Sequence, residues 1–403
     1  MKAFSPDSSD AAAAIELLAR LVAFDTVSAR SNLPLIGAVE TYLRSHGVQP
    51  QRVECGDKAG LFASIGPASP GGVVLSGHTD VVPVDGQSWS SDPFTLAERD
   101  GRLHGRGTAD MKGFIATALA CVPLFTAKQL RVPIHLAFSH DEEVGCLGAP
   151  PLIAALLARV PRPAAVVVGE PTGMQVADHH RGITRFVTTI NAPGGHSSIP
   201  RPGRNAIALA ARFVIELEDL GRGFADECQG AQDTIPEHTT LNIGRIGGGT
   251  AVNMIAEHCR VDWECRPAPG KSAADVTARL QDVLRPWQAS APDASIVTAQ
   301  VVSVPPFAAG RDSPAVALAL RLTGHERSVA APFASEAGLF EAAGVPAVVC
   351  GPGRTSEAHQ PDEFVSREQM SACLEFMQRL SEWASESPAN GMHPPHARPF
   401  SRA

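Results

Sequence analysis

Apolar positions recur with two different spacings along the chain, and the spacing predicts the first elements. Over residues 10–24 the apolar side chains have the period of a helix: Ile15, Leu18, Leu21 and Val22. A second helix is predicted over 34–46, with Pro34 at its start and Gly47 just past its end. Both helices have an apolar stripe that would pack against other elements of the fold.

Three continuous apolar runs, rich in β-branched residues, predict buried strands. They are GGVVLSGHTDVVP (71–83), VPIHLAFSHDEE (132–143) and AAVVVGEPT (164–172), with helical stretches between them. This alternation predicts an α/β sheet with helices on both faces. Ligands of such sheets bind beyond the carboxyl ends of the strands, and the predicted strand within each of these runs ends in His, Asp or Glu.

The pattern changes after Arg181, where strand, helix, two strands, helix and strand follow one another. That order predicts a ferredoxin-like α+β domain. The α/β pattern then resumes and ends with a helix near 366–385. We therefore predict a larger α/β domain built from 1–180 and 298–386, and a smaller inserted domain over 181–297. Residues 387–403 contain four Pro and no hydrophobic period, which predicts a flexible tail.

Composition narrows the function classes. With 403 residues, the chain is long enough for two domains, and its formal net charge of -8 argues against a nucleic-acid partner. The first apolar stretch, AAAAIELLARLVAF, contains Glu16 and Arg20, which argues against a signal peptide or a membrane span. Eight cysteines without a CxxC pair favour free thiols in a reducing compartment, so we expect a cytoplasmic protein.

Five short segments at strand ends and in loops contain His and carboxylates. They are GHTD (77–80), GTADMKG (107–113), HDEE (140–143), GEPT (169–172) and EAHQPDE (357–363). Imidazole and carboxylate without thiolate are the ligands of a catalytic zinc, cobalt or manganese site. His78 and Asp80 share one face of a strand, where the carboxylate could hold the imidazole N–H. Glu142 and Glu143 are adjacent, which favours one as a metal ligand and the other as a base.

Each of these motifs also has an ordinary structural explanation. A His-x-Asp pair can be a hydrogen-bonded surface pair, adjacent Glu residues can form a solvated face, and a GEP segment can be a simple turn after a strand. Their joint occurrence at the ends of buried strands favours a site, because unpaired carboxylates there would cost several kcal/mol of desolvation.

Across residues 15–385 these motifs resemble the M20 family of dinuclear-zinc peptidases and deacylases, and within it the acetylornithine deacetylase branch. The similarity includes SGHTDVVPVDG, GRGTADMKG, DEE, GEPT, GGHSS and AHQPDE. The resemblance implies two divalent ions per subunit, zinc or alternatively cobalt, and a cis peptide bond between Asp110 and Met111. One ion would be bound by His78 and Glu170 and the other by Glu143 and His359, with Asp110 bridging both, Glu142 as general base and Asp80 orienting His78.

The resemblance also assigns roles to residues of the smaller domain, which it implies to be a lid and a dimerisation domain. His196 of GGHSS would stabilise the oxyanion, in its own or a partner subunit, although it could instead cap the region that follows. Substrate-binding roles fall to Arg181, Asn253 and Arg266, because an arginine fork can pair both oxygens of a substrate carboxylate. Arg266 could equally balance the charges of its neighbours on the strand. The Gly-rich run at 244–249 lies between two strands, which argues against a phosphate loop.

The leading hypothesis is hydrolysis of the amide bond of an N-acyl amino acid by a homodimer, with N2-acetyl-L-ornithine as the first substrate to test. The products would be L-ornithine and acetate, as in arginine biosynthesis. Desuccinylation of a diaminopimelate derivative, deacylation of another amino acid and cleavage of a dipeptide use the same metal core. A non-catalytic binding protein on the same fold is the alternative from another class, although every ligand position and the base position hold suitable residue types.

Overall fold

Two compact units make up the chain. The computed structural model describes residues 9–200, 205–228 and 236–386, so the tail predicted over 387–403 lies outside the described residues. The large unit comprises Met1–Asp178, Ala309–Ala331 and Ser335–Ala403, and the small unit comprises His179–Ala308 with Pro332–Ala334. The predicted boundary at 181 falls just inside the small unit, and that at 297 falls within its last long strand.

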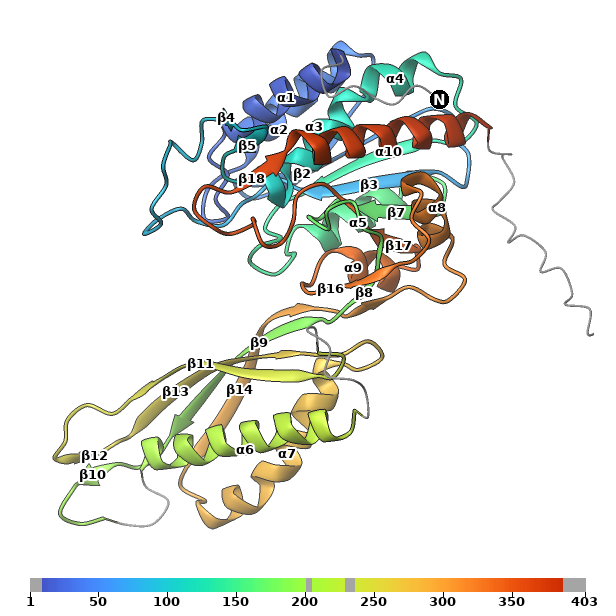
Figure 1. The fold of residues 1–403 in the computed structure, drawn as a ribbon. Coiled ribbons are helices and arrows are strands. Elements are labelled where there is room, and N and C mark those ends of the chain that lie inside the picture. The colour runs from blue at the N-terminus through green and yellow to red at the C-terminus, as the bar shows by residue number, and fades with distance from the viewer. Residues whose placement is uncertain (1–8, 201–204, 229–235, 387–403) are drawn as a thin grey trace, which may run out of the picture. The chain divides into compact units, whose positions relative to one another are not determined.

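A mixed sheet forms the centre of the large unit (Figure 1). Its four middle strands, β6, β3, β7 and β17, are parallel. At one side of them β2 pairs antiparallel with β6, and β1 pairs antiparallel with β2. At the other side β8 pairs antiparallel with β17, and β15 and β16 lie beside β8. The strands are β1 (Gln51–Cys55), β2 (Lys58–Ile65), β3 (Val73–His78), β6 (Ile134–Ser139), β7 (Ala165–Val168), β8 (Ala177–His180), β15 (Phe307–Ala308), β16 (Val329–Ala331) and β17 (Ala347–Val349). Because β3, β6 and β7 are parallel, their carboxyl ends lie at one edge.

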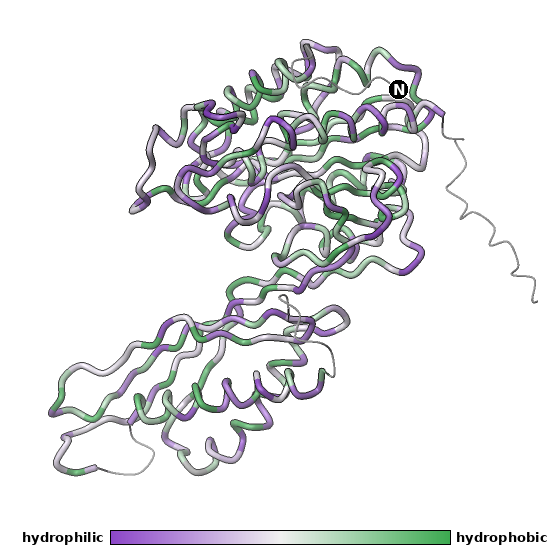
Figure 2. Tube along the Cα trace, in the orientation of Figure 1, coloured by the Kyte–Doolittle hydropathy of each residue, from purple (hydrophilic) through white to green (hydrophobic). Residues whose placement is uncertain are grey.

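Helices cover both faces of this sheet, as the strand and helix alternation predicted. α3 packs on β3 and lies between α1 and α10, whereas α5 and α9 cover the opposite face (Figure 1). The helices are α1 (Ser9–Val22), α2 (Leu33–Ser45), α3 (Gly113–Ala120), α4 (Val122–Ala127), α5 (Ala149–Leu157), α8 (Pro314–Thr323), α9 (Ala337–Ala342) and α10 (Arg367–Glu386). The central strands β2, β3, β6 and β7 and helix α3 are predominantly apolar (Figure 2), and their side chains contribute to the main buried core.

The long apolar helical stretch Thr108–Ala127 is a core element. Its length and mean hydropathy of 1.3 would suit a membrane span, but 83% of its most apolar window is buried inside the protein. It joins α3 and α4 to a preceding segment, η1 (Thr108–Lys112), in which Asp110 and Met111 have non-helical backbone angles. The stretch therefore contributes to the hydrophobic core of the large unit.

A small antiparallel sheet links three loops at the edge of the large unit. It consists of β4 (Ala97–Arg99), β5 (Arg102–His104) and β18 (Phe364–Ser366), with Phe364 opposite His104. This pairing continues beyond the strands, where the Gly105 N–H donates to the carbonyl of Glu363 at 2.9 Å. As a result, the loop that ends at Glu363 lies beside the loop that begins at Gly105.

His135, inside β6, gives the large unit a defined pH dependence. The residue is 1% exposed, its Nδ1 hydrogen-bonds to Ser64 Oγ at 2.8 Å, and its Nε2 is buried with no partner. Burial lowers the pKa of His135 to about 4. In the unfolded chain the His135 imidazole binds a proton with a pKa of about 6.5. Between that pH and about pH 4 the unfolded state therefore binds this proton and the folded state does not. As the pH falls through this range, the free energy of unfolding decreases by about 3 kcal/mol.

We expect the unfolding free energy, measured with urea, to decline more steeply between about pH 6.5 and about pH 4 in the wild type than in His135→Asn. Other titrating groups are shared by the two proteins and cancel in the comparison. Equal pH dependence in both would show that His135 does not make this contribution.

The small unit has the predicted ferredoxin-like order, which confirms the fold class. Its sheet runs β11, β13, β9, β14, with α6 and α7 packed on one face (Figure 1). A two-stranded sheet of β10 and β12 is added to this plan. The elements are β9 (Ile183–Asn191), β10 (Gly195–His196), α6 (Ala206–Asp226), β11 (Thr240–Gly248), β12 (Met254–Ile255), β13 (His258–Arg266), α7 (Ala273–Ser290) and β14 (Ser295–Val304).

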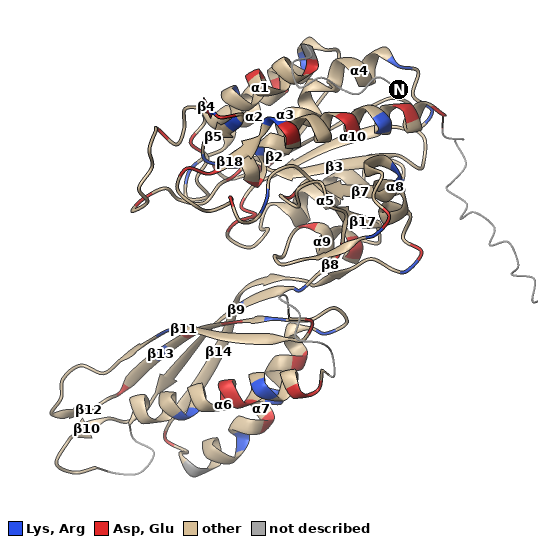
Figure 3. Ribbon diagram, viewed as in Figure 1, with Lys and Arg blue, Asp and Glu red and all other residues tan. Residues whose placement is uncertain are grey.

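Caps and aromatic contacts stabilise this unit. The Asn205 side chain accepts from two backbone N–H groups at the start of α6, and Ser272 and Asp275 form a capping box at the start of α7. Phe186 and Trp263 stack in the core with their ring centroids 4.3 Å apart. Acidic and basic residues are interspersed along α6, α7 and α10 (Figure 3), which is the pattern of solvated helix faces.

Candidate metal centre

The carboxyl ends of three parallel strands bring the first predicted residues together. His78 is the last residue of β3, Glu142 and Glu143 follow the end of β6, and Glu170 follows the end of β7. β3 pairs in parallel with both β6 and β7, so all three strand ends lie at the same edge of the sheet. His78 Nε2 lies 3.8 Å from Glu170 Oε1.

Asp110 lies between the two predicted groups of ligands. It belongs to η1, and the peptide bond between Asp110 and Met111 is cis, as the resemblance implied. One carboxylate oxygen, Oδ1, lies 2.9 Å from His78 Nε2, and the other, Oδ2, lies 3.2 Å from His359 Nε2. Asp110 thus presents a different oxygen to each histidine.

Glu143 and His359 complete the second group. His359 Nε2 lies 3.2 Å from Glu143 Oε1 and 3.1 Å from Glu143 Oε2. The ligand atoms of His78, Asp110 and Glu170 lie within 4.8 Å of one another, as do those of Asp110, Glu143 and His359. The two groups of three residues share the carboxylate of Asp110. Each consists of one His and two carboxylates, and these are ligand types that Zn²⁺ binds in proteins.

The electrostatics of the cluster fit a cation. Burial raises the pKa of Glu170 well above its usual range, and the charges of Asp110 and Glu142 raise it further. Burial likewise raises the pKa of Glu143, and the charge of Asp110 adds to the effect. Glu170 Oε1 is moreover buried without a hydrogen-bond partner. Such a buried excess of carboxylates is unfavourable unless positive charge balances it, which divalent ions would do.

The histidines respond to the same excess of negative charge. Burial by itself lowers the pKa of His78, but the hydrogen bond with Asp110 and the charge of Glu170 raise it well above its usual value. Hydrogen bonds with Asp110 and Glu143 raise the pKa of His359 to about 10. Without a metal ion, both imidazoles would therefore be protonated, and a metal ion bound at Nε2 would replace that proton.

Glu142 is half-buried next to the ligands, and its carboxylate has a neutral neighbour. The Cys146 thiol donates to Glu142 Oε1 at 3.3 Å. Burial raises the pKa of Glu142 well above its usual range, and although His78 lowers it, the charges of Glu143 and Asp110 raise it. A raised pKa suits a carboxylate that accepts and returns a proton near neutral pH.

The Asp80 side chain has different partners from those expected. His78 Nδ1 hydrogen-bonds to the backbone carbonyl of Asp80 at 2.9 Å, whereas its distance to Asp80 Oδ1 is 3.6 Å. The Asp80 carboxylate accepts from the backbone N–H groups of Glu142 at 3.1 Å and Glu143 at 3.3 Å, and from Ser28 Oγ at 2.7 Å. It therefore holds the loop that carries the predicted base, and the imidazole is oriented through the backbone of Asp80.

The remaining predicted residues lie in the small unit, at two places. Arg181 donates to Thr240 Oγ1 at 2.8 Å, and Thr240 pairs with Arg266, which places both arginines at one end of β11 and β13. His196 is exposed on β10 opposite Met254, and the Ser197 N–H donates to the Asn253 carbonyl at 3.2 Å. Asn253 is thus near His196, beyond the other end of β11, rather than beside the arginines.

Four residues that the sequence reasoning did not single out contact this centre or a residue that does. Cys146 and Ser28 hydrogen-bond to Glu142 and Asp80, and nothing in their local sequence indicates it. Arg106 and Glu363 form a buried ion pair at 2.6 Å, and both side chains are 1% exposed. The signal for these two was available, because each is a charged residue inside a motif, GRGTADMKG or AHQPDE, for which no role was assigned.

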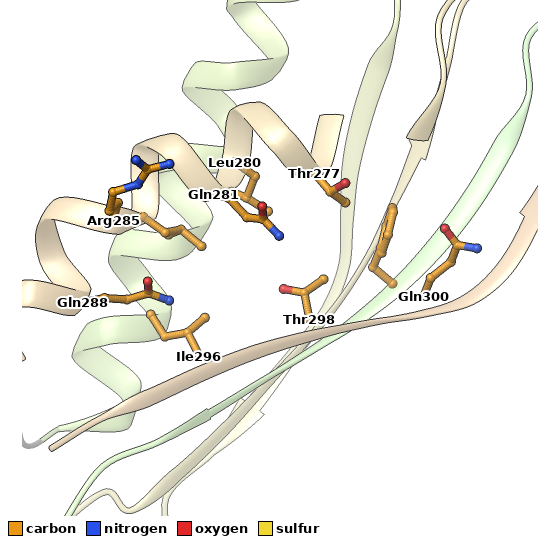
Figure 4. Close-up of a pocket in the computed structure, with 10 residues that line it drawn as sticks. Thr277, Leu280, Gln281, Arg285, Gln288, Ile296, Thr298 and Gln300 are labelled. Atoms are coloured by element: carbon orange, nitrogen blue, oxygen red, sulfur yellow. The ribbon is translucent and has the colours of Figure 1, made fainter. Parts of the chain in front are cut away.

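A separate open cavity of about 580 Å³ lies in the small unit between α7 and β14 (Figure 4). Leu280, Leu284 and Ile296 contribute apolar side chains to its wall, and glutamines and threonines contribute polar ones. None of the predicted site residues is among the described residues that line it. The metal centre of the large unit therefore remains the candidate for chemistry.

Solved structures share this fold. The M20 family metallo-carboxypeptidase Sso-CP2 from Sulfolobus solfataricus superposes with a TM-score of 0.74 at 18% identity, covering 94% of this chain and 99% of that chain. The Bacillus subtilis YXEP protein, a dinuclear metal binding peptidase from the M20 family, superposes with a TM-score of 0.67 at 17% identity, covering 93% and 98%. Identities this low show similarity of fold alone.

Sequence comparison establishes the family. The pattern of Peptidase family M20/M25/M40 matches residues 74–383. The acetylornithine deacetylase of Proteus mirabilis (strain HI4320) is 34% identical over 378 residues, covering 91% of this chain and 96% of the relative. That of Photorhabdus laumondii is 34% identical over 361 residues, covering 87% and 92%. With these matches and its paired groups of metal-ligand residues, the chain belongs to the M20/M25/M40 family and is a metallohydrolase similar to acetylornithine deacetylases.

Proposed function

We propose that this metallohydrolase hydrolyses the amide bond of an N-acyl amino acid, with N2-acetyl-L-ornithine as its preferred substrate, giving L-ornithine and acetate. The relatives named acetylornithine deacetylase, 34% identical over about nine-tenths of the chain, carry the choice of substrate. The two groups of His and carboxylate ligands around Asp110 support the reaction class.

The proposal includes two divalent ions per chain, zinc or alternatively cobalt. His78, Glu170 and Asp110 would hold one, and Glu143, His359 and Asp110 the other. The chemistry that such ions supply is polarisation of the amide carbonyl and acidification of a water molecule. The buried, unpartnered oxygen of Glu170 and the raised carboxyl pKa values of the cluster support this assignment.

Residues of the chain would handle the proton and the developing charge. Glu142, with its raised pKa, would take the proton of the attacking water and deliver it to the leaving amine. Asp80 would support this step by holding the backbone of Glu142 and Glu143. His196, which is exposed on the small unit, would donate to the oxyanion from its own or a partner subunit.

Arg181, Arg266 and Asn253 would bind the substrate. The two arginines are held at one end of the same strand pair, and a guanidinium fork there suits the α-carboxylate of an amino acid. Asn253, next to His196, would act with that histidine rather than with the arginines. The proposal also includes a homodimer, which rests on the family resemblance, and a cytoplasmic location, which rests on the free cysteines. Light scattering of the purified protein tests the dimer.

The substrate proposal predicts a ranked profile. Protein stripped with chelator and reloaded with zinc or cobalt should release amine from N-acetyl-L-ornithine faster than from N-acetylcitrulline or N-succinyl-diaminopimelate. The chelated protein should be inactive and recover on addition of metal, because the ions supply most of the stabilisation of charge in the transition state.

Other outcomes of the same panel change the proposal in defined ways. Preference for the succinylated substrate or for a dipeptide would keep the reaction class and replace the substrate. Inactivity on every member of the panel with both metals bound would favour a non-catalytic binding protein on this fold.

A further inference from the structure

Glu363 is a buried carboxylate whose two oxygens have different partners. Oε2 accepts from Arg106 Nη1 at 2.6 Å. Oε1 accepts from two consecutive backbone N–H groups, those of Ala109 at 2.9 Å and Asp110 at 3.1 Å. One oxygen therefore forms an ion pair, and the other contacts the backbone of the residue that lies between the two groups of metal ligands.

The same residue is anchored to the loop of a second ligand. Glu363 lies four residues after His359, directly before β18, and its carbonyl accepts from the Gly105 N–H at 2.9 Å. His104 Nδ1 hydrogen-bonds to the carbonyl of Asp362 at 3.0 Å, and Gln87 donates to the carbonyl of His359 at 2.9 Å. The contacts of Gly105 and His104 fasten the loop of His359 to the segment that leads to Asp110, and Gln87 fastens it to the loop after β3.

We propose that Glu363 is a positioning residue that fixes Asp110 relative to His359, and so builds the second metal-binding group before metal arrives. This inference rests on the two ions of the proposed function. Asp110 has non-helical backbone angles, φ -124° and ψ 92°. The helix that follows it offers no acceptor for its N–H, because helical N–H groups donate to carbonyls that precede them in sequence. The Oε1 of Glu363 supplies the acceptor that this turn lacks.

Glu363 matters more for one group than for the other. His78 and Glu170 are held by adjacent parallel strands and keep their places without Glu363. His359, in contrast, lies in a loop and meets Glu143 and Asp110 across a sequence separation of 216 residues and more. Loss of the Glu363 acceptor should therefore weaken metal binding by the group with His359 and leave the group with His78 and Glu170 occupied.

Two double variants separate this role from that of the ion pair. Both replace Arg106 by Met, so each removes the whole buried ion pair of Arg106 and Glu363. Removing both charges of a buried pair destabilises a protein far less than removing one of them. Arg106→Met with Glu363→Gln keeps a carbonyl oxygen to accept from Ala109 and Asp110. Arg106→Met with Glu363→Leu has no acceptor at that position.

The readout is Co²⁺ binding to the metal-stripped protein by isothermal titration calorimetry, which does not depend on activity. We expect two binding events in the wild type and in the Gln variant, with affinities within about threefold. In the Leu variant one of the two events should lose about 10–100-fold in affinity, the usual effect of removing a group that orients a metal ligand, and the other should remain. Arg52→Met, which breaks the Arg52–Glu40 pair between β1 and α2, is the control for general destabilisation.

Each alternative result has one meaning. Equal Co²⁺ binding by the Gln and Leu variants would overturn the positioning role, as would a comparable loss in Arg52→Met. If the Leu variant does not fold, Glu363→Asp replaces it, because its shorter side chain keeps the charge but cannot reach both N–H groups. Fewer than two binding events in the wild type would overturn the two-metal proposal itself, and this inference with it.

Discussion

Replacing Glu142 by glutamine should lower kcat by about 10²–10⁴ while the protein still binds its metal ions. The change removes the proton acceptor but keeps the size of the side chain. The backbone N–H of residue 142 can still donate to Asp80, and the Cys146 thiol can still donate to the remaining carbonyl oxygen. The loss should therefore fall on proton transfer rather than on the shape of the site.

Steady-state kinetics on the best substrate of the panel, with metal content measured on the same samples, test this expectation. Glu142→Asp is the matched control, since it keeps a carboxylate one methylene further from the reacting atoms and should retain more activity than the glutamine variant. Turnover by Glu142→Gln within about tenfold of the wild type would place the base elsewhere. Loss of metal together with activity would instead identify Glu142 as a ligand.

Replacing Gly169 by alanine should destabilise the large unit by more than about 3 kcal/mol, above the usual range for an overpacked core. A Cβ at this position would lie 2.0 Å from Cγ of Phe114 and 2.2 and 2.3 Å from its Cδ atoms. Phe114 is itself fully buried on α3, so its ring cannot move aside without disturbing the core. Because Gly169 directly precedes Glu170, the displacement would also reach the metal centre.

Urea unfolding of the purified variant measures this effect. Gly37→Ala, in α2, is the control, because a Cβ there meets nothing within 4 Å and alanine favours a helix by up to about 1 kcal/mol. Combining Gly169→Ala with Phe114→Leu should cost less than the sum of the two single changes, since the clash depends on the ring. Additive effects, or a stable Gly169→Ala protein, would show that the core adapts at this point.

Local sequence patterns were sufficient for the central strands, for the order of the main elements of the small unit and for the kind of chemistry. The apolar runs around His78, Glu142 and Glu170 predicted buried strands of one α/β sheet with polar residues at their ends, and in the structure β3, β6 and β7 are parallel neighbours. The reason is geometric, because a buried strand between helices leaves little freedom in direction or position. The ferredoxin-like order of the small unit was likewise readable from alternating periods within about 120 residues.

The partners of the polar side chains could not be read from local patterns. The Asp80 carboxylate binds the backbone of Glu142 and Glu143, although a spacing of two residues had suggested His78. The Asn253 side chain was grouped with the two arginines, whereas β11 separates Asn253 from them. A carboxylate or amide accepts from any donor within reach, so its partner depends on segments that are distant in sequence.

The sequence by itself therefore determined the fold class, the family and the types of residue at the metal centre, because these follow from hydrophobic period and from short motifs. Only the tertiary structure decided which atoms meet. It brought Glu363 to the backbone of Asp110 across 253 residues and His359 to Glu143 across 216. Such contacts depend on how loops are fastened after the strands have paired, and no local period encodes that step.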